Sequence, residues 1–517
     1  MSVLKPSLLL TGATGYLGKH ILWQLLQQGY RVNVIVRRKK ICPRERVIEV
    51  LKSVGPFNEE FLYVIEGDLT QPDCGIDPIE LQKLAKTSIS ALIHSAGLTR
   101  FDEHLADEIY QNNLHGTKQV YALARRLGIE NFHHLSTAYV AGDTRQTFMS
   151  TDLDVDQKFN NPYEASKYEA EKYLHDACRA DAIRVVIYRP GIIVGGYPLG
   201  ENNVVSTVYT FMKALHFIRE CCRRDLERGR GIFARCGVRQ DDDALFIPLR
   251  IAADPELSIN LVSVTSVVDR IVKGLITDNP KYIVVPLLGN DFSLNRLRSA
   301  ICRALGIKGI SYVANSDFDQ LPRSVVEGNF FRAISSYQPY LFAAPDFAEV
   351  EKDKGTQIDI ERISVEFSEL MDNKKALKQE RGDLNRLALN ALGVSGAHDY
   401  FHRFINGQLG ESFLKRIAYV DTKIRFLISG AQVFDQVIHF NKGKIYFAHG
   451  PDFDCSYELN QLIFNEIVSG RIDLRNAFFD GKIKIKGDRE IALKFGFLFN
   501  DHFLNIDDRI LEEVAGQ

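Results

Sequence analysis

The sequence predicts an α/β protein in which a doubly wound parallel sheet is followed by a small α+β domain. Three observations predict this fold. Short apolar runs alternate with helical patterns over the first 190 residues, and a glycine-rich loop joins the first run to the first helical pattern. From about residue 405 the chain changes to strands in which apolar and polar residues alternate. The first pattern indicates a parallel sheet covered by helices, and the last indicates strands with one buried face.

Six apolar runs are the candidate strands of the parallel sheet. They are rich in Val, Ile and Leu without polar alternation, which is typical of strands that are buried on both faces. The helical patterns between them carry apolar stripes, and the first stripe ends at Gly29. The candidate strands are Ser7–Leu10, Arg31–Val36, Leu62–Ile65, Ala91–His94, Phe132–Ser136 and Arg184–Tyr188.

Residues 191–350 do not show the regular alternation of strands and helices, except in one segment. Loops are longer, an arginine-rich helix is expected between Arg219 and Arg239, and residues 260–275 resemble a strand followed by a helix. We interpret this region as a substrate subdomain, so that the first domain spans residues 1–350. The next segment, residues 351–404, is highly charged with a helical pattern, and we expect a linker there.

Residues 405–517 are expected to form the α+β domain. A hairpin is expected at Asn441-Lys442-Gly443. Helices are expected at Leu459–Val468 and at Arg489–Phe499, the second with Asp488 as its N-cap. The alternating apolar positions are Ile424, Phe426, Ile428, Ile483 and Ile485.

Composition excludes several classes of protein. A chain of 517 residues is too long for one core, and a net charge of −2 argues against a nucleic-acid partner. The eight cysteines form no C-x-x-C pair, which argues against zinc sites and disulfide frameworks. The N-terminus has no signal-peptide pattern, and no apolar stretch reaches the roughly 18 residues of a membrane span. We therefore expect a soluble cytoplasmic protein with reduced thiols, no metal and at most peripheral membrane contact.

The loop TGATGYLG, Thr11–Gly18, lies between the first strand and the first helix. This context is the one that a dinucleotide-binding, Rossmann-type fingerprint requires. Gly12 permits the tight turn, Gly15 lets the backbone approach a pyrophosphate, and Gly18 lets the helix pack closely. The N-terminus of the helix presents free N–H groups to the phosphates.

The residues after the second strand indicate which dinucleotide binds. An NAD site has an acidic residue there, whereas this chain has Arg37 and Arg38. An arginine can pair with a 2′-phosphate, so we expect NADPH as the cofactor. The alternative is that residues 37–40 form only an exposed basic turn. Asp68, after the third strand, is expected near the adenine.

Tyr163 and Lys167 are four residues apart in a helical pattern, so their side chains share one face. A tyrosine alone is a poor acid near neutral pH, since its pKa is about 10. A neighbouring ammonium favours the phenolate and lowers that pKa. The pair therefore predicts a group that transfers one proton.

Six motifs in order show a family resemblance: TGATGYLG, HSAGLTRFDE (94–103), Asn113 with Gly116-Thr117, HLSTAYVAG (134–142), YEASK and YRPGIIVG (188–195). They resemble the extended short-chain dehydrogenase/reductases, and more narrowly the fatty acyl-CoA reductase and carboxylic acid reductase (thioester reductase) branch. That branch often has a second alanine after HSA, where this chain has Gly97.

The resemblance implies roles for individual residues. Tyr163 would be the general acid, Lys167 would bind the nicotinamide ribose, Thr137 would bind the substrate carbonyl, and Asn113 would support the helix and a proton-relay water. Arg189, Pro190 and Gly191 would line the floor near the nicotinamide. Further cofactor contacts are implied at Thr11, Thr14, Tyr16, Leu17, Leu69, Ser95, Ala96 and Ile192. Two strand-end histidines, His94 and His134, are interpreted as packing residues.

The C-terminal stretch 456–495 resembles the sterol-carrier-protein family of lipid-binding domains, most clearly from SGRID through AFFDGKIKIKGD. Such domains bury an apolar ligand, so the domain would hold or present an acyl chain. The alternative is a stabilising or dimerising module without ligand. The aromatic candidates for a lipid tunnel are Phe464, Phe478, Phe479, Phe495 and Phe497.

Together these resemblances imply an NADPH-dependent reductase of long-chain acyl thioesters, with acyl-CoA or an acyl carrier protein as the substrate and an aldehyde or alcohol as the product. The arginine-rich segment 219–239 would receive the acidic carrier or the coenzyme A phosphates, or would simply be a solvated helix. The alternatives are a sterol or other lipid alcohol dehydrogenase, a sugar-nucleotide epimerase, and a lipid carrier without catalysis. The oligomeric state stays open.

Overall fold

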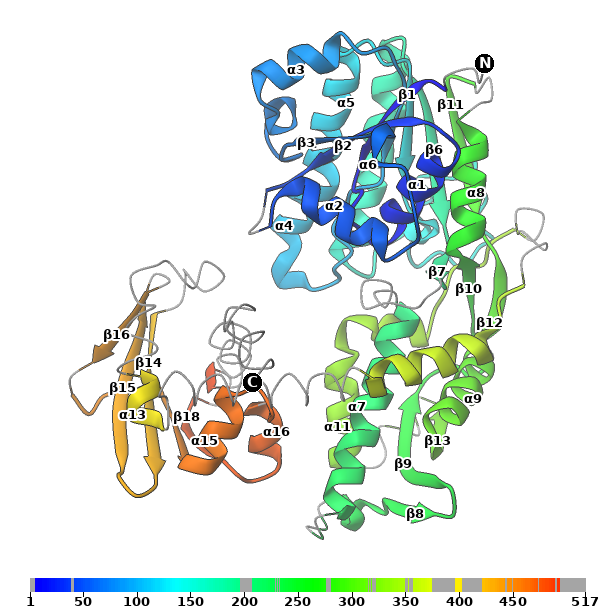
Figure 1. The fold of residues 1–517 in the computed structure, drawn as a ribbon. Helices are drawn as coiled ribbons and strands as arrows, with labels where there is room; N and C mark the ends of the chain where they lie inside the picture. The colour runs from blue at the N-terminus through cyan, green and yellow to red at the C-terminus, as the bar shows by residue number, and fades with distance from the viewer. Residues whose placement is uncertain are drawn as a thin grey trace. The chain divides into compact units, whose positions relative to one another are not determined.

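The computed structural model divides the chain into two compact units, Met1–Leu370 and Met371–Gln517 (Figure 1). It describes residues 5–38, 41–195, 207–227, 229, 231, 233–275, 280–314, 316, 318, 322–348, 352, 357–373, 396–401, 421–441, 444–448, 450–472, 474–488 and 491–492. Each unit is described below by itself.

The first unit is built on a parallel seven-stranded sheet with the order β11-β6-β5-β4-β1-β2-β3. Six of these strands confirm the six candidate strands, with ends that differ by at most two residues. The seventh, β11, comes from the region that we assigned to the substrate subdomain, so the chain returns to the sheet after leaving it. The strands are β1 (Ser7–Thr11), β2 (Arg31–Val36), β3 (Leu62–Glu66), β4 (Ile89–His94), β5 (Asn131–Leu135), β6 (Arg184–Pro190) and β11 (Tyr282–Leu287).

Helices cover both faces of this sheet (Figure 1). One apolar core joins the sheet to α1 (Tyr16–Gln27), α2 (Pro43–Lys52) and α8 (Val264–Gly274). The other joins it to α3 (Pro78–Ala85), α5 (Gly116–Arg126) and α6 (Pro162–Ala180). The structure therefore confirms the doubly wound α/β fold. It also confirms the predicted strand and helix at 260–275, which are β10 (Ser258–Ser263) and α8.

The rest of the first unit has two three-stranded sheets, with the orders β12-β10-β7 and β13-β9-β8. The predicted arginine-rich helix is only half right. The helix α7 ends at Glu227, and Gly229 and Gly231 just after it have positive φ, which a right-handed helix cannot contain. A short 3-10 turn at residues 234–236 and the strand β8 at residues 239–241 follow, separated by Gly237 in a left-handed conformation. The further elements are β7 (Ile192–Val194), α7 (Thr207–Glu227), β8 (Arg239–Asp241), β9 (Ala244–Ala252), β12 (Asn290–Ser293), α9 (Leu294–Leu305), β13 (Ile307–Val313) and α11 (Val325–Ala333).

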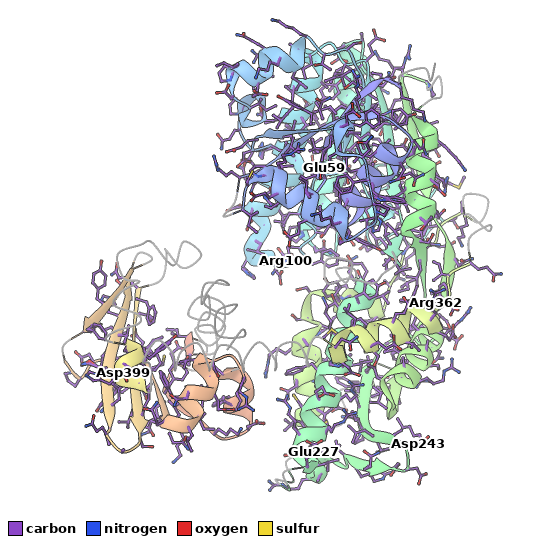
Figure 2. The ribbon with its side chains drawn as sticks, in the orientation of Figure 1. Glu59, Arg100, Glu227, Asp243, Arg362 and Asp399 are labelled. Atoms are coloured by element: carbon purple, nitrogen blue, oxygen red, sulfur yellow. The ribbon has the colours of Figure 1, made fainter. Side chains whose placement is uncertain are left out.

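Residues 360–373, within the expected linker, form a helix. Its apolar side is buried, since Ile360, Ile363 and Phe367 are at most 4% exposed. The Phe367 ring stacks on Tyr209 of α7 at 6.2 Å. Arg362, labelled in Figure 2, lies on the opposite, exposed side and pairs with Glu366 at 2.8 Å. This part of the charged segment therefore packs on the first unit. We keep the domain boundaries 1–350, 351–404 and 405–517 as a proposal.

The second unit has a mixed five-stranded sheet with the order β16-β15-β14-β17-β18 and helices packed against it. The predicted hairpin strands are confirmed, because β15 and β16 pair antiparallel with Asn441 opposite Lys444; the turn residues Lys442 and Gly443 lie outside the described residues. The alternating apolar positions are confirmed too, because all five side chains are buried. Asp488 accepts the Ile491 N–H at 3.0 Å, as an N-cap does. The rest of that helix lies outside the described residues. The elements are α13 (Ala397–Asp399), β14 (Asp421–Ser429), β15 (Phe434–Asn441), β16 (Lys444–Ala448), β17 (Cys455–Asn460), α15 (Gln461–Val468), α16 (Leu474–Phe479) and β18 (Lys484–Gly487).

A buried ion pair fixes α6 to the sheet. Glu171 of α6 is inaccessible to solvent and Arg189 of β6 is 2% exposed. The guanidinium binds the carboxylate through Nε at 3.1 Å and Nη2 at 2.8 Å. Its Nη1 donates to the carbonyls of Ser150 and Asp152. Since both charges have partners with good geometry, the pair sets where α6 lies on the sheet.

Replacing Arg189 with methionine leaves Glu171 as an uncompensated buried charge, so we expect the free energy of unfolding to fall by about 3–5 kcal/mol. The measurement is urea unfolding followed by the fluorescence of Trp23, the single tryptophan of the chain, which lies on α1 and reports on the first unit. The control is Arg303→Met, which removes an exposed pair with Glu361 and should change stability little. Equal losses in the two variants would contradict the role of the buried pair.

Candidate active site

The glycine loop forms a tight cradle at the carboxyl end of β1. Gly12 has a φ of +77°, and a Cβ there would lie 2.5 Å from the Ala96 nitrogen. A Cβ on Gly18 would lie 2.0 Å from the Gly12 carbonyl oxygen, so the helix packs directly on its own loop. Gly15 is exposed and is the N-cap of α1. The free N–H groups of this helix end are those that a pyrophosphate would bind, so the cradle fits a dinucleotide.

The other expected cofactor positions surround the same end of the sheet. The Thr11 hydroxyl is hydrogen-bonded to His94. The Ser95 N–H donates to the Thr11 carbonyl oxygen at 3.3 Å, and the Ala96 N–H donates to the Thr11 hydroxyl at 3.4 Å. The Tyr16 hydroxyl donates to the Gly195 carbonyl at 2.6 Å. The remaining positions lie close to these strand ends: partly exposed Thr14 and Leu17 beside the loop, Leu69 after β3, and buried Pro190 and Ile192 where β6 leads into β7.

Arg37 is expected to bind a 2′-phosphate and Asp68 to lie near the adenine. In the structure the two side chains bind each other. Their side chains form an ion pair at 3.1 Å, and both remain partly exposed. Arg37 also donates to the Asn112 amide oxygen at 3.2 Å. Burial raises the pKa of Asp68, but hydrogen bonds from Thr70 and the charge of Arg37 outweigh it, so the pKa is lowered overall. A 2′-phosphate would therefore compete with a carboxylate for this guanidinium.

The structure brings Thr137, Tyr163 and Lys167 together. The Thr137 hydroxyl, at the end of β5, is hydrogen-bonded to the Tyr163 phenol. One turn further along α6, the Lys167 ammonium donates to the Leu135 carbonyl oxygen at 2.7 Å. Lys167 is 4% exposed and Thr137 is 6% exposed. A phenol, a hydroxyl and an ammonium thus converge on one strand end, where a carbonyl oxygen could bind.

The electrostatics of the pair differ from the prediction. Burial raises the pKa of Tyr163 to about 12, opposed by the Thr137 hydrogen bond and assisted by the charge of neighbouring Glu164. Burial also lowers the pKa of Lys167 to about 8, although Glu171 partly offsets this effect. The predicted lowering of the tyrosine pKa is therefore absent in this structure, because desolvation dominates both groups.

Asn113 holds three segments of the site. It lies in one π-helical turn, Gln111–His115, between α4 (Ala106–Tyr110) and α5. Its amide accepts the Leu98 N–H at 2.7 Å and donates to the Leu98 carbonyl at 3.1 Å. It also donates to the Ser166 hydroxyl on α6 at 3.0 Å. Asn113 therefore fixes the loop after β4 against the helix of Tyr163 and Lys167.

His94 is more than a packing residue. Thr117 donates to the Asn113 carbonyl at 2.5 Å, so its oxygen accepts from Nε2 of His94 at 3.0 Å. Nδ1 then accepts from the Thr11 hydroxyl at 2.7 Å, which assigns one neutral tautomer. Burial, with a contribution from Lys167, lowers the pKa of His94 to about 3. This neutral ring ties the glycine loop to α5.

Sequence reasoning missed an aromatic wall beside Tyr163. Phe101 stacks on the Tyr163 ring, with centroids 5.6 Å apart and an interplanar angle of 29°. The same ring contacts Tyr337 at 4.9 Å and Tyr340 at 5.8 Å, and Tyr340 contacts Tyr139. Phe101 lies within a quoted motif, but the tyrosines at 337 and 340 are more than 170 residues from Tyr163 in sequence. The local pattern gave no signal for them.

Two other expectations change. Arg189 does not offer its guanidinium to the nicotinamide floor, because it is committed to Glu171 and two carbonyls. In the arginine-rich segment, Arg219 is buried and binds Glu220 at 3.1 Å, while Arg223 pairs with the same carboxylate. Arg239 pairs with Asp241 at 2.9 Å. These described arginines are therefore bound within their own unit.

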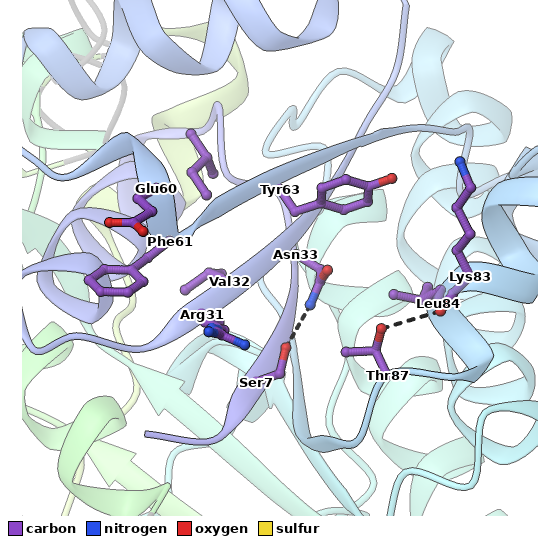
Figure 3. Close-up of a pocket in the computed structure, with 11 residues that line it drawn as sticks. Ser7, Arg31, Val32, Asn33, Glu60, Phe61, Tyr63, Lys83, Leu84 and Thr87 are labelled. Atoms are coloured by element: carbon purple, nitrogen blue, oxygen red, sulfur yellow. Dashed lines mark hydrogen bonds between the residues drawn. The ribbon is translucent and has the colours of Figure 1, made fainter. Parts of the chain in front are cut away.

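A groove of about 280 Å³ lies at the opposite edge of the sheet, where β1, β2 and β3 begin (Figure 3). Asn33 donates to the Ser7 hydroxyl at 2.9 Å there, and Arg31 and Lys83 are among the residues that line the groove. It is far from the carboxyl ends of the strands, where ligands of such folds bind.

No helix in the described ranges combines the length and apolar character that crossing a bilayer requires.

Comparison with known families confirms both resemblances. Residues 10–228 match the family model NAD_binding_4, described as "Male sterility protein", and residues 409–500 match the "SCP-2 sterol transfer family". The first match supports a nicotinamide cofactor at this site. Of the tunnel candidates, Phe464 is buried in the core of the second unit and Phe478 packs against it. The Phe479 side chain, Phe495 and Phe497 lie outside the described residues.

Individual relatives cover only part of the chain. Mouse "Fatty acyl-CoA reductase 1" is 38% identical over 146 residues, which are 26% of this chain and 28% of that protein. "UDP-glucose 4-epimerase" of Haemophilus influenzae is 32% identical over 178 residues, 34% of this chain and 49% of the epimerase. The chain therefore spans between about a quarter and a half of the length of these curated relatives.

Solved structures show the same fold over most of the chain. The terminal R domain of the myxalamid PKS-NRPS pathway aligns with a TM-score of 0.53 and 22% identity, covering 72% of this chain and 92% of the domain. A thiolation-reductase di-domain of an archaeal non-ribosomal peptide synthetase aligns with a TM-score of 0.52 and 20% identity, covering 72% and 76%.

Replacing Gly18 with alanine should weaken nicotinamide nucleotide binding at least tenfold, since the new Cβ would overlap the Gly12 carbonyl oxygen and displace the loop. Titration of NADPH fluorescence measures the affinity. Gly328→Ala is the control, because this helical glycine has no atom within 4 Å of the new Cβ and should bind normally. Unchanged affinity in Gly18→Ala would show that the cradle does not hold the cofactor.

Proposed function

We propose that this chain, with its Male sterility-type domain followed by an SCP-2-type domain, is an NADPH-dependent reductase of long-chain acyl thioesters, acting in the cytoplasm. The substrate is an acyl-CoA or an acyl carrier protein, and the product is an aldehyde, with an alcohol after a second round. The observation that carries the proposal is the aromatic wall at Tyr163. The experiment that tests it is turnover of acyl thioesters, described below.

The wall favours an apolar substrate. Phe101 covers one face of the Tyr163 ring, and Tyr337 and Tyr340 extend the surface. The Tyr340 hydroxyl is already engaged, since it donates to Glu164 and accepts from Asn161. A hydrocarbon chain gains free energy by covering such rings. A nucleotide sugar would lose hydrogen bonds of its hydroxyls against them, which argues against the epimerase alternative.

The residues of the site have complementary tasks in this proposal. The nicotinamide cofactor supplies a hydride to the carbonyl carbon of the thioester. Thr137 and Tyr163 donate hydrogen bonds to the carbonyl oxygen as negative charge develops on it. Lys167 binds the nicotinamide ribose. Collapse of the tetrahedral adduct then releases the thiol and leaves the aldehyde.

The tail of the chain supports a lipid substrate. The SCP-2 match covers residues 409–500, and the described part of that unit has a continuous apolar core that includes Phe401, Phe426 and Phe464. We propose that this unit binds the acyl chain and supplies it to the reductase. Delipidated full-length protein should take up a fluorescent fatty acid if this is so.

Purified protein should oxidise NADPH when long-chain acyl thioesters are added, and Tyr163→Phe should lower the rate at least 100-fold, as is typical when a general acid is lost. NADPH binding should stay within a few-fold of normal, because the ring remains. Tyr168→Phe is the control on the same helix and should keep its activity. The measurement is NADPH absorbance with a panel of acyl-CoA and acyl carrier substrates. No turnover across the panel would refute the function.

Arg37→Ala should weaken NADPH binding by about 10- to 100-fold, since one charge-assisted hydrogen bond contributes about 1.5–3 kcal/mol. Binding of NADH, which has no 2′-phosphate, should change much less. Arg44→Ala is a matched control, because its guanidinium is equally exposed and pairs with Glu59. Fluorescence titration with both nucleotides measures the ratio. Equal losses for NADPH and NADH would contradict the preference for NADPH.

A further inference from the structure

His134 is a buried histidine that the chemistry above does not use. It lies on β5 opposite His94 of β4, and the two rings are 5.3 Å apart. Its side chain is inaccessible to solvent, and neither ring nitrogen has a hydrogen-bond partner among the described residues. An unsatisfied polar ring in a protein interior is costly and calls for an explanation.

The other histidines of these strands have partners. His94 is hydrogen-bonded through both ring nitrogens, to Thr11 and Thr117. His133, on the opposite face of β5, binds the Tyr188 hydroxyl at 3.1 Å and is equally buried. His134 is thus the exception, and it faces the layer of α5 and α6, as Phe132 does two residues earlier.

Lys167 approaches this part of β5 from α6. The ammonium donates to the carbonyl of Leu135, the residue after His134. Lys167 lowers the pKa of both His134 and His94, in each case after the larger effect of burial. The other titratable groups around the ammonium are Tyr163 and Glu171 on its own helix. An ammonium carries three N–H donors, and one acceptor is in place.

We propose that His134 is a positioning residue for Lys167: its neutral imidazole accepts a hydrogen bond from one water that the ammonium holds, and this keeps Lys167 charged and aimed at the cofactor ribose. This inference deepens the proposed function and rests on its assignment of Lys167. Ser136, two residues on and also buried without a partner for its hydroxyl among the described residues, would bind the same water.

The test measures nicotinamide nucleotide affinity between pH 6 and pH 10, so it requires no acyl substrate. Affinity should fall as Lys167 loses its proton, with a midpoint near 8, the pKa of this buried ammonium. In His134→Met the acceptor for the water at the ammonium is lost, the charged form is less favoured, and the midpoint should move down by about one pH unit, a tenfold change in the protonation equilibrium. His134→Gln, which keeps an acceptor of similar reach, should restore the midpoint.

His133→Met is the matched control. It removes an equally buried histidine from the same strand, on the face away from Lys167, and should leave the midpoint unchanged. An equal shift in the two methionine variants, or no shift in either, would overturn the inference. If His134→Met does not fold, His134→Asn replaces it as the test variant. The asparagine side chain is polar but too short to reach the water at the ammonium, so the pH midpoint of nucleotide affinity must move down in the same way. A shift in a protein that reduces no acyl thioester would refute the proposed function and leave this inference standing.

Discussion

The position of α6 on the sheet is the constraint on which the site depends. The helix carries the phenol, the ammonium and Glu171, and the strands carry the groups that these side chains meet. Glu171 binds Arg189 of β6, and Lys167 binds the Leu135 carbonyl at the end of β5. Asn113 adds a third attachment through Ser166. Because each contact is buried and directional, the helix cannot slide or rotate without losing several of them, and the Tyr163 phenol keeps its place beside Thr137.

The same burial that orders the site opposes its chemistry. Removing a phenol and an ammonium from water disfavours the charged form of each, so the pKa of Tyr163 rises while that of Lys167 falls. Proton transfer at neutral pH requires a lower pKa for Tyr163 and a higher pKa for Lys167. A bound nucleotide would add ribose hydroxyls next to the ammonium, and these stabilise its charge. If the cofactor binds as we propose, protonation of Lys167 would be coupled to nucleotide binding.

The sequence predicts well what depends on short patterns. The six strands and the glycine loop could be located because buried parallel strands and tight turns impose local composition. The hairpin at Asn441 followed from the same reasoning. The strand β11, the aromatic wall and the Arg189–Glu171 pair could not be located, since each joins residues that are distant in the chain. The direction of the Tyr163 pKa was missed for a related reason: the spacing of Tyr163 and Lys167 gives their proximity, whereas desolvation is set by every element that packs over them.

The π-helical turn at Gln111–His115 has a consequence for how the gene can vary. Such a turn accommodates one residue more than an α-helix of the same rise. Deleting one residue there would restore regular α-helical winding and keep the faces of α4 and α5 as they are, but it would shift the side chains within the turn, including Asn113. Asn113 would then leave Leu98 and Ser166, whereas Thr117, which lies beyond the turn in α5, would keep its contact with His94. The length of this segment, and not only the identity of its residues, therefore determines whether Asn113 reaches its partners.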